Sequence, residues 1–288
     1  MRHSRESGNP GVFPGAHPIH FLVTENLQSL EAAARARLAT HHSRALVFEH
    51  EGQRYVVKKL AAKPRKLIQT LFMRWVVKHL TGQPLPLRTL ALSEASGSME
   101  YEANRLKSMA AAGMRVPRVA LVTPEFFVLE FCGTVVATLL EKWTAEEWRR
   151  ELPRLATELG EFHRAGFWHG GAQIKNITMQ DGLSYRIDFE ENFGEFLPST
   201  AVQAADLVLF LNSISLAGPI MESESRQLLP QLLDRYFAAN PNNEIKAIIR
   251  RGLPLMNRLA AFAGLFQRWS RKGIRRIIIL VDVLNGLK

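Results

Sequence analysis

The chain has little cysteine and no long apolar run. Its 288 residues include one cysteine, Cys132, which excludes an internal disulfide and a cysteine-rich metal site. A single cysteine is typical of a reducing compartment such as the cytoplasm. No apolar segment approaches the roughly 18 residues of a membrane-spanning helix, and the start of the sequence has no signal-peptide core. We therefore expect a cytoplasmic protein.

Acidic residues are too few to balance the basic ones. The chain carries 37 Lys and Arg against 27 Asp and Glu, a formal net charge of +10. The excess is concentrated in residues 244–288, which hold ten basic and two acidic residues. Such a charge predicts a polyanionic partner: nucleic acid, an anionic membrane surface or an anionic substrate. Nucleic acid is the least favoured, because no aromatic and basic motif of a nucleic-acid module is present.

The first residues contrast with the rest of the chain. Residues 1–17 are rich in Gly, Pro, Ser, Arg and His and lack periodicity, so we expect a disordered or spurious extension. The string RHSRESGNPG also resembles a translated intergenic repeat of bacterial genomes, which predicts a Gram-negative source. The remainder, with 47% hydrophobic residues overall, has a globular composition.

The first third of the globular part predicts a small sheet. We expect a strand over 21–24, a helix over 27–38, and a hairpin over 45–60 that turns at Glu51-Gly52. Strand alternation places Lys58 and Lys59 on opposite faces. A basic amphipathic helix over 64–80 then packs on the small lobe or rests on an anionic membrane surface. No G-x-G-x-x-G loop precedes the hairpin.

The following segments alternate between helices and short strands. They are a helix over 99–113 carrying Glu100 and Glu102, a strand into which Val116-Pro117 leads, a buried strand over 126–130, a helix capped by Thr144, a helix over 153–164, and an apolar helix over 203–215 carrying Asp206.

The stretch 163–191 organises the chain. It predicts a helix end, a loop over 168–176, a short strand, a turn at Asp181-Gly182, and a strand over 185–189 that delivers Asp188. Asn176 and Asp188 then face each other across a hairpin. A carboxylate and an amide oxygen on rigid elements suit Mg²⁺ beside a nucleotide.

This layout resembles the protein-kinase-like phosphotransferases. His169-Gly170, an Asn six residues after Gly170, and Asp188-Phe189-Glu190 follow the order of that superfamily. The resemblance implies an α+β, bilobal fold, with a small antiparallel-sheet lobe over residues 18–133 and a mainly helical lobe over 134–288. It also implies ATP and Mg²⁺ as cofactors.

The resemblance further assigns roles to single residues. Lys58 would contact the nucleotide phosphates and pair with Glu102, for which Glu100 is the competing choice. The backbone of Glu130 and Cys132 would bond the adenine edge. Asn176 and Asp188 would be the metal ligands, and Asp206 would support the catalytic loop.

One position departs from the family pattern. Gly171 stands where the catalytic-loop aspartate is expected, and glycine cannot accept a proton. A general base is worth about 10²–10⁴ in rate, whereas phosphoryl transfer depends mainly on positioning and charge neutralisation. Gln173 could orient a hydroxyl instead, or His169 could act as a base if it is not a structural residue of the loop. Both an active phosphotransferase and a pseudokinase scaffold remain open.

Short segments indicate the subfamily. YEANRL, VLEFCG, IDFEE and ADLVLFL resemble the lipopolysaccharide-core (Kdo/heptose) kinases and the small RIO-type and KEOPS-subunit kinases. The first of these resemblances implies an anionic glycolipid or envelope precursor as substrate, at the cytoplasmic face of the inner membrane. The basic helices agree with a peripheral position there.

Overall fold

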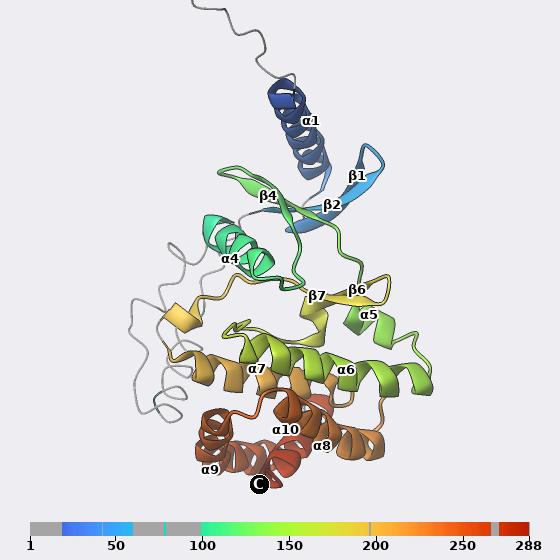
Figure 1. Ribbon diagram of the computed structural model, residues 1–288. Helices are drawn as coiled ribbons and strands as arrows, with labels where there is room; N and C mark the ends of the chain where they lie inside the picture. The colour runs from blue at the N-terminus through green and yellow to red at the C-terminus, as the bar shows by residue number, and fades with distance from the viewer. Residues whose placement is uncertain are drawn as a thin grey trace, which may run out of the picture.

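The protein has two lobes with different secondary structure (Figure 1). The computed structural model describes residues 19–41, 43–59, 78, 99–195, 197–265 and 271–287. The first lobe contains a four-stranded antiparallel sheet, and the second is mainly helical with a three-stranded sheet at its upper side. The predicted α+β bilobal fold is confirmed. The predicted extension over 1–17 and the helix over 64–80, apart from the isolated residue Lys78, lie outside the described residues.

The small lobe is built on a sheet of strand order β1-β2-β4-β3. Its elements are α1 (Ile19–Thr40), β1 (Ala45–His50), β2 (Gln53–Lys59), α4 (Met99–Ala111), β3 (Val119–Val122) and β4 (Phe126–Glu130).

The β1–β2 hairpin has the predicted turn. Both Glu51, at φ 49°, and Gly52, at φ 75°, adopt the left-handed backbone of a two-residue primed turn. The register places Ala45 opposite Lys58 at the other end of the hairpin. β2 also pairs with β4, so Lys58 lies on a central strand. Its backbone position is therefore fixed on both sides.

The strand predicted over 21–24 is wrong, because the structure continues α1 through it. Adding residues to an existing helix costs little once the helix has nucleated. Packing of the later turns provides that nucleus. Leu30, Ala34 and Leu38 of α1 are buried against the sheet, beside Phe48 and Val57.

The large lobe contains the remaining elements. They are β5 (Thr134–Val135), α5 (Val136–Leu140), α6 (Ala145–Arg164), the 3₁₀ turn η1 (Ile174–Asn176), β6 (Ile177–Gln180), β7 (Leu183–Arg186), the 3₁₀ turn η2 (Phe193–Glu195), α7 (Ser199–Ile214), α8 (Glu222–Ala239), α9 (Asn243–Leu265) and α10 (Arg271–Asn285).

A single helix, α6, replaces the two helices predicted before the central loop. Thr144 caps it with a capping box to Glu147, as predicted. The helix then runs through Pro153 without ending. A proline inside a helix costs about 3 kcal/mol, but Leu152, Leu155 and Leu159 are fully buried on one face. Their packing outweighs the local cost of the proline.

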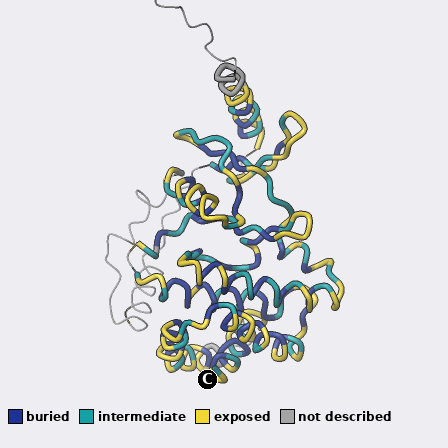
Figure 2. Tube along the Cα trace, in the orientation of Figure 1, coloured by how far each residue is buried: buried dark blue, intermediate teal, exposed yellow. Residues whose placement is uncertain are grey.

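The core of the large lobe lies between α6, α7, α8, α9 and α10. Figure 2 shows buried residues along the inner faces of these helices and exposed ones on the outside. Tyr236 of α8 is fully buried there and lies 2.7 Å, hydroxyl to Nδ1, from His163 at the end of α6. None of the described helices is both long enough and apolar enough to cross a membrane.

The connection between the lobes is tightly packed. Residues 131–133 link β4 to β5, as predicted for the hinge. Gly133 has φ 99°, and a Cβ atom there would lie 2.0 Å from the carbonyl oxygen of Met179 in β6. Only glycine fits so close to another backbone segment.

Replacing Gly133 with alanine should therefore destabilise the protein strongly. We expect Gly133→Ala to lower the free energy of unfolding by at least about 3 kcal/mol, from backbone strain and the clash with Met179. Gly113→Ala is the matched control, because Gly113 also has positive φ (78°) but has no atom within 4 Å of its added Cβ. The control should lose about 1 kcal/mol. If denaturant unfolding shows that Gly133→Ala and Gly113→Ala lose the same free energy of unfolding, the close packing of Gly133 against Met179 is contradicted.

Candidate functional site

A buried ion pair joins β2 to α4. Lys58 is 8% exposed and Glu102 is 3% exposed. The ammonium group donates to both carboxylate oxygens of Glu102, at 3.0 and 2.8 Å. Glu100, the competing choice, is exposed. The structure thus brings Lys58 together with Glu102.

Asp188 completes the cluster from the large lobe. Its Oδ1 accepts a hydrogen bond from Lys58 Nζ at 2.5 Å. Asp188 does not lie in a strand as predicted, because β7 ends at Arg186 and Asp188 adopts the left-handed φ of 70°. This conformation turns the chain out of the sheet. The next amide, of Phe189, then donates to Glu102 at 3.1 Å.

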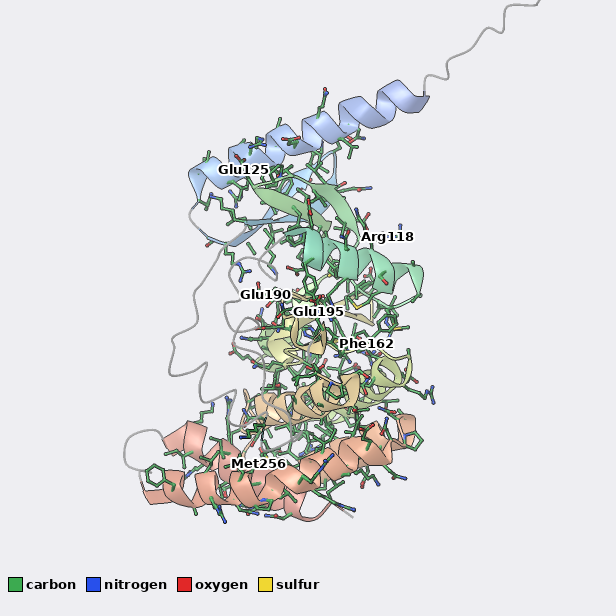
Figure 3. The ribbon with its side chains drawn as sticks, turned by 90° about the vertical axis from the view of Figure 1, so that its left-hand side faces the viewer. Arg118, Glu125, Phe162, Glu190, Glu195 and Met256 are labelled. Atoms are coloured by element: carbon green, nitrogen blue, oxygen red, sulfur yellow. The ribbon has the colours of Figure 1, made fainter. Side chains whose placement is uncertain are left out.

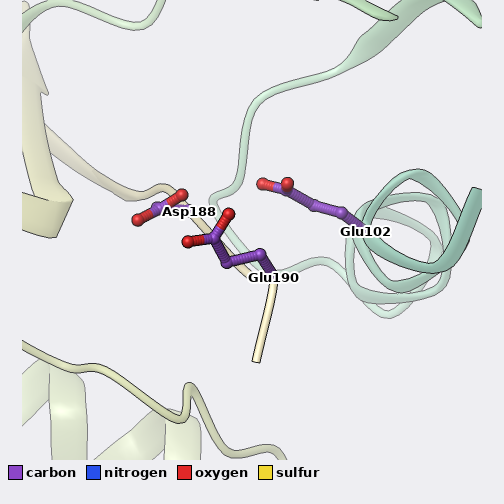
Figure 4. A group of neighbouring side chains, drawn as sticks. All are labelled: Glu102, Asp188 and Glu190. Atoms are coloured by element: carbon purple, nitrogen blue, oxygen red, sulfur yellow. The ribbon is translucent and has the colours of Figure 1, made fainter. Parts of the chain in front are cut away.

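A third carboxylate lies beside this cluster. Glu102 comes from α4, whereas Asp188 and Glu190 follow β7, and the three carboxylates point toward one another (Figure 4). One oxygen from each lies within 4.8 Å of the others. Figure 3 shows Glu190 at the level between the small-lobe sheet and the helices of the large lobe. Arg44, just before β1, forms an ion pair with Glu190 through both terminal nitrogens.

Burial and charge act in opposite directions on these groups. Burial alone would lower the pKa of Lys58, but the carboxylates of Glu102 and Asp188 outweigh burial and raise it. Burial would raise the pKa of Asp188, but Lys58 above all lowers it. Burial raises the pKa of Glu102, although Lys58 opposes that shift. Lys58 is thus held charged and Asp188 is held ionised.

The catalytic-loop region is held by Asp206 of α7, as predicted. The buried carboxylate accepts hydrogen bonds from the backbone amides of His169 at 2.6 Å, Gly170 at 2.9 Å and Ala172 at 3.3 Å. His163 Nε2 lies 3.5 Å from the same carboxylate. Although burial would raise the pKa of Asp206, its histidine and amide neighbours outweigh burial and lower it.

His169 is a structural residue of this loop. Its side chain is fully buried and stacks on Phe189, with ring centroids 4.4 Å apart. Nε2 bonds the carbonyl of Ile187 at 2.9 Å, and Nδ1 accepts from the amide of Gly171 at 3.2 Å. Burial lowers the pKa of His169 to about 4. With both ring nitrogens engaged, the idea that His169 serves as the base is wrong.

Gln173 and Asn176 flank the position of the missing aspartate. Asn176 donates from Nδ2 to the carbonyl of Gly171 at 2.8 Å. The backbone carbonyl of Asn176 accepts a hydrogen bond from the backbone amide of Ile187 at 2.9 Å. This bond places Asn176 beside the residue that precedes Asp188. Gln173 is half-buried in the same loop, where its backbone amide bonds the carbonyl of Gly171. That Gln173 orients a hydroxyl stays a prediction.

The hinge residues Glu130 and Cys132 lie at the junction of the lobes. No backbone hydrogen bond of the described residues uses the amide of Cys132, which suits a bond to a ligand. Burial raises the pKa of the Cys132 thiol, which lies 3.2 Å from the hydroxyl of Thr178. Both hinge residues line a pocket of about 460 Å³ that does not include Lys58 or Asp188. Adenine binding at the hinge stays a prediction.

Arg105 of α4 ties three segments together. Its guanidinium donates to the carbonyls of Trp168 at 2.7 Å, Phe189 at 3.1 Å and Glu191 at 2.8 Å. It also lies 3.7 Å above the Trp168 ring. Burial lowers the pKa of Arg105. This residue links the helix of Glu102 to the loop before His169 and to the segment after Asp188.

Sequence reasoning missed Arg44, Arg105 and Glu190. Arg105 is in the YEANRL segment, and its helical spacing of three residues from Glu102 was a usable signal. Glu190 is in the quoted IDFEE segment. Arg44 had no signal, because a single basic residue before a strand is ordinarily solvated.

The acidic residues can hold a divalent cation. Carboxylate and amide oxygens are ligands that Mg²⁺ prefers. Glu102, Asp188 and Glu190 each bring one carboxylate oxygen within 4.8 Å of the others, with Lys58 and Arg44 as their present cationic partners. That Asn176 is a further metal ligand stays a prediction. The donor set is therefore compatible with Mg²⁺.

The order of these residues along the chain resembles that of the protein-kinase-like superfamily. No protein-family model matches the chain. Among curated proteins, the KEOPS complex subunit Bud32 of Pyrococcus abyssi is 32% identical over 111 residues, which are 38% of this chain and 50% of that protein. The chain thus matches about half the length of this relative. The similarity confirms the predicted resemblance to KEOPS-subunit kinases.

Among solved structures, WaaP in complex with acyl carrier protein aligns with the chain. The alignment covers 73% of this chain and 84% of that chain, with a TM-score of 0.38 and 15% sequence identity.

Removing the charge of Asp206 should destabilise the loop. Asp206→Asn loses charge-assisted hydrogen bonds to several backbone amides, so we expect the free energy of unfolding to fall by about 3 kcal/mol at pH 7. Because the pKa of Asp206 is lowered, its stabilisation is complete above the ordinary aspartate pKa of about 4 and is lost as the pH falls through the folded value.

Denaturant unfolding of wild type and variant at several pH values checks this. The difference in the free energy of unfolding between wild type and Asp206→Asn should be constant from about pH 8 to pH 5 and should become smaller below about pH 4. The exposed Asp234 supplies the control Asp234→Asn, which should change stability by less than about 0.5 kcal/mol. A pH-independent difference would contradict the ionised state of Asp206.

Proposed function

We propose that the protein is an atypical kinase-like phosphotransferase that uses ATP and Mg²⁺. The observation that carries this proposal is the contact of one buried ammonium, Lys58, with Glu102 and with Asp188. In phosphoryl transfer the catalyst positions the phosphates and neutralises their charge. Lys58 would bind phosphate oxygens, with Glu102 holding it in place. Mg²⁺, when held by Asp188 and Asn176, would neutralise further phosphate charge.

The proposed acceptor is a sugar hydroxyl of a lipopolysaccharide core or another envelope glycolipid. The resemblance of several segments to lipopolysaccharide-core kinases supports it, as does the surface of the large lobe. Helices α9 and α10 pack together and expose basic residues, with Leu259 and Ile277 exposed among them. The exposed basic residues are Arg250, Arg251, Arg258, Lys272 and Arg275. A basic surface with apolar side chains suits an anionic membrane. We therefore propose a cytoplasmic protein that binds the inner membrane peripherally.

Nucleotide binding should depend on the buried ion cluster. Calorimetric titration of ATP should show Mg²⁺-dependent binding that Lys58→Ala and Asp188→Ala each weaken by at least about tenfold, the loss expected for one charge-assisted contact. Lys59→Ala is the matched control, because Lys59 instead donates to the carbonyl of Leu38. The proposal fails if wild type does not bind ATP at millimolar concentration.

Gly171 favours a second candidate, a pseudokinase that binds nucleotide without turnover. The fold does not require glycine there. A Cβ at position 171 would meet Asn176 Nδ2 at 3.6 Å and His169 Nδ1 at 3.9 Å, both ordinary contacts, and its φ is not positive. An aspartate can therefore be introduced without strain.

Phosphate transfer to purified core oligosaccharide separates the two candidates. Wild type should transfer phosphate from ATP, and Gly171→Asp should accelerate transfer by about 10²–10⁴, the value of a general base. Gly171→Asn is the control, with the same shape but no base, and should stay at the wild-type rate. Activity only in Gly171→Asp would favour the pseudokinase. Absence of transfer in all three would reject this acceptor.

A further inference from the structure

The hairpin that carries Lys58 supplies no phosphate-binding loop. Its turn, Glu51-Gly52, has two residues and lies at the far end of the strands from Lys58. Lys58 is five positions beyond Gln53, or roughly 17 Å at the rise of a strand. At the end of the hairpin near Lys58, only residues 41–44 separate α1 from β1. Among the described residues of this connection, which are His41, Ser43 and Arg44, the last carries a guanidinium that can bind phosphate.

Arg44 is fixed at that end. Its carbonyl oxygen accepts a hydrogen bond from the amide of Lys59 at 2.8 Å, which continues the β1–β2 pairing by one residue. The guanidinium extends to Glu190 of the large lobe. Its Nε is buried and has no hydrogen-bond partner among the residues that the structure describes. A buried donor without a partner is costly, so a hydrogen bond from this nitrogen to a ligand oxygen would be favourable.

Glu190 holds the guanidinium among the other charged groups of the cluster. Its Oε2 lies 3.9 Å from Lys58 Nζ, and an oxygen of Glu190 lies within 4.8 Å of oxygens of Asp188 and Glu102. Each cation of the cluster is thus paired with a carboxylate: Lys58 with Glu102 and Asp188, and Arg44 with Glu190. A guanidinium binds phosphate in the same forked geometry in which it binds a carboxylate.

We propose that Arg44 is a phosphate-binding residue of this cleft and that Glu190 is its resting counter-ion, which the phosphates of a nucleotide displace. The exchange replaces one anionic partner of the guanidinium with another, and it gives Nε a partner. This inference rests on the proposed nucleotide binding. It assigns to Arg44 part of the work that a glycine-rich loop does in protein kinases.

The test compares ATP with adenosine, which has no phosphates. Calorimetric titration of the full chain should show that Arg44→Ala weakens ATP binding by about 10–100-fold, the loss of a charge-assisted contact. Adenosine binding should be unchanged. Arg44→Lys keeps the charge but loses the fork, so its ATP affinity should lie between those of wild type and Arg44→Ala. Arg35→Ala is the matched control, because Arg35 pairs with Glu31 and Glu125 in the same lobe.

The counter-ion role has its own variant. Glu190→Gln removes the competing anion, so it should tighten ATP binding several-fold without added metal. In the double variant with Arg44→Ala that gain should vanish, because the two residues act as a pair.

Three results would overturn the inference. If Arg44→Ala binds ATP as wild type does while Lys58→Ala does not, the proposed function stands and the role of Arg44 is wrong. Equal weakening of ATP and adenosine by Arg44→Ala would show a structural role only. If wild type fails to bind ATP at millimolar concentration, the proposed function fails as well.

Discussion

A buried ammonium group joins the two lobes, and the rest of the site depends on it. Lys58 brings a charge into a place where it is stable only when paired. Its partners come from both sides of the cleft, Glu102 from α4 and Asp188 from the segment after β7. One set of hydrogen bonds, from Lys58, therefore connects the sheet, α4 and the large lobe to one another.

Two supporting groups keep the partners in place. Asp206 accepts hydrogen bonds from backbone amides on both sides of Gly171, and Arg105 donates to carbonyls of the same loop and of the segment after Asp188. Both groups are charged and act on the backbone, so they fix the chain without depending on the identity of the loop side chains. This explains why the loop can keep its conformation although Gly171 replaces the expected aspartate.

The cluster is more acidic than basic. Lys58 and Arg44 supply two positive charges against the three carboxylates of Glu102, Asp188 and Glu190, which leaves one net negative charge. A free nucleotide polyanion would be repelled by that excess, whereas a nucleotide that arrives with a divalent cation would not. The same excess gives a physical reason for the metal dependence proposed above.

The sequence predicted the elements that carry local signals. The Glu51-Gly52 turn and the Thr144 cap were predictable, because turn and cap residues have distinct backbone requirements. The strand expected over 21–24 and the helix break expected at Pro153 failed, because packing of α1 and α6 overrode local preferences. Lys58, Glu102 and Asp188 could be predicted from their order along the chain.

Arg44 and Glu190 could not be predicted as a pair. They are 146 residues apart, and neither has a distinctive local setting. Only the approach of the two lobes brings them together. The buried state of His169 has the same origin, since its environment is made by Phe189, Ile187 and the backbone of the loop.

The most direct test is a crystal structure of the full chain grown with Mg²⁺ and a non-hydrolysable ATP analogue. We expect phosphate oxygens within hydrogen-bond distance of Lys58 Nζ, with the metal on Asp188 and the Lys58–Glu102 pair retained, as the proposed nucleotide site requires. A nucleotide bound away from Lys58 and Asp188, or an unchanged Lys58–Asp188 contact with no nucleotide at saturating concentration, would contradict it.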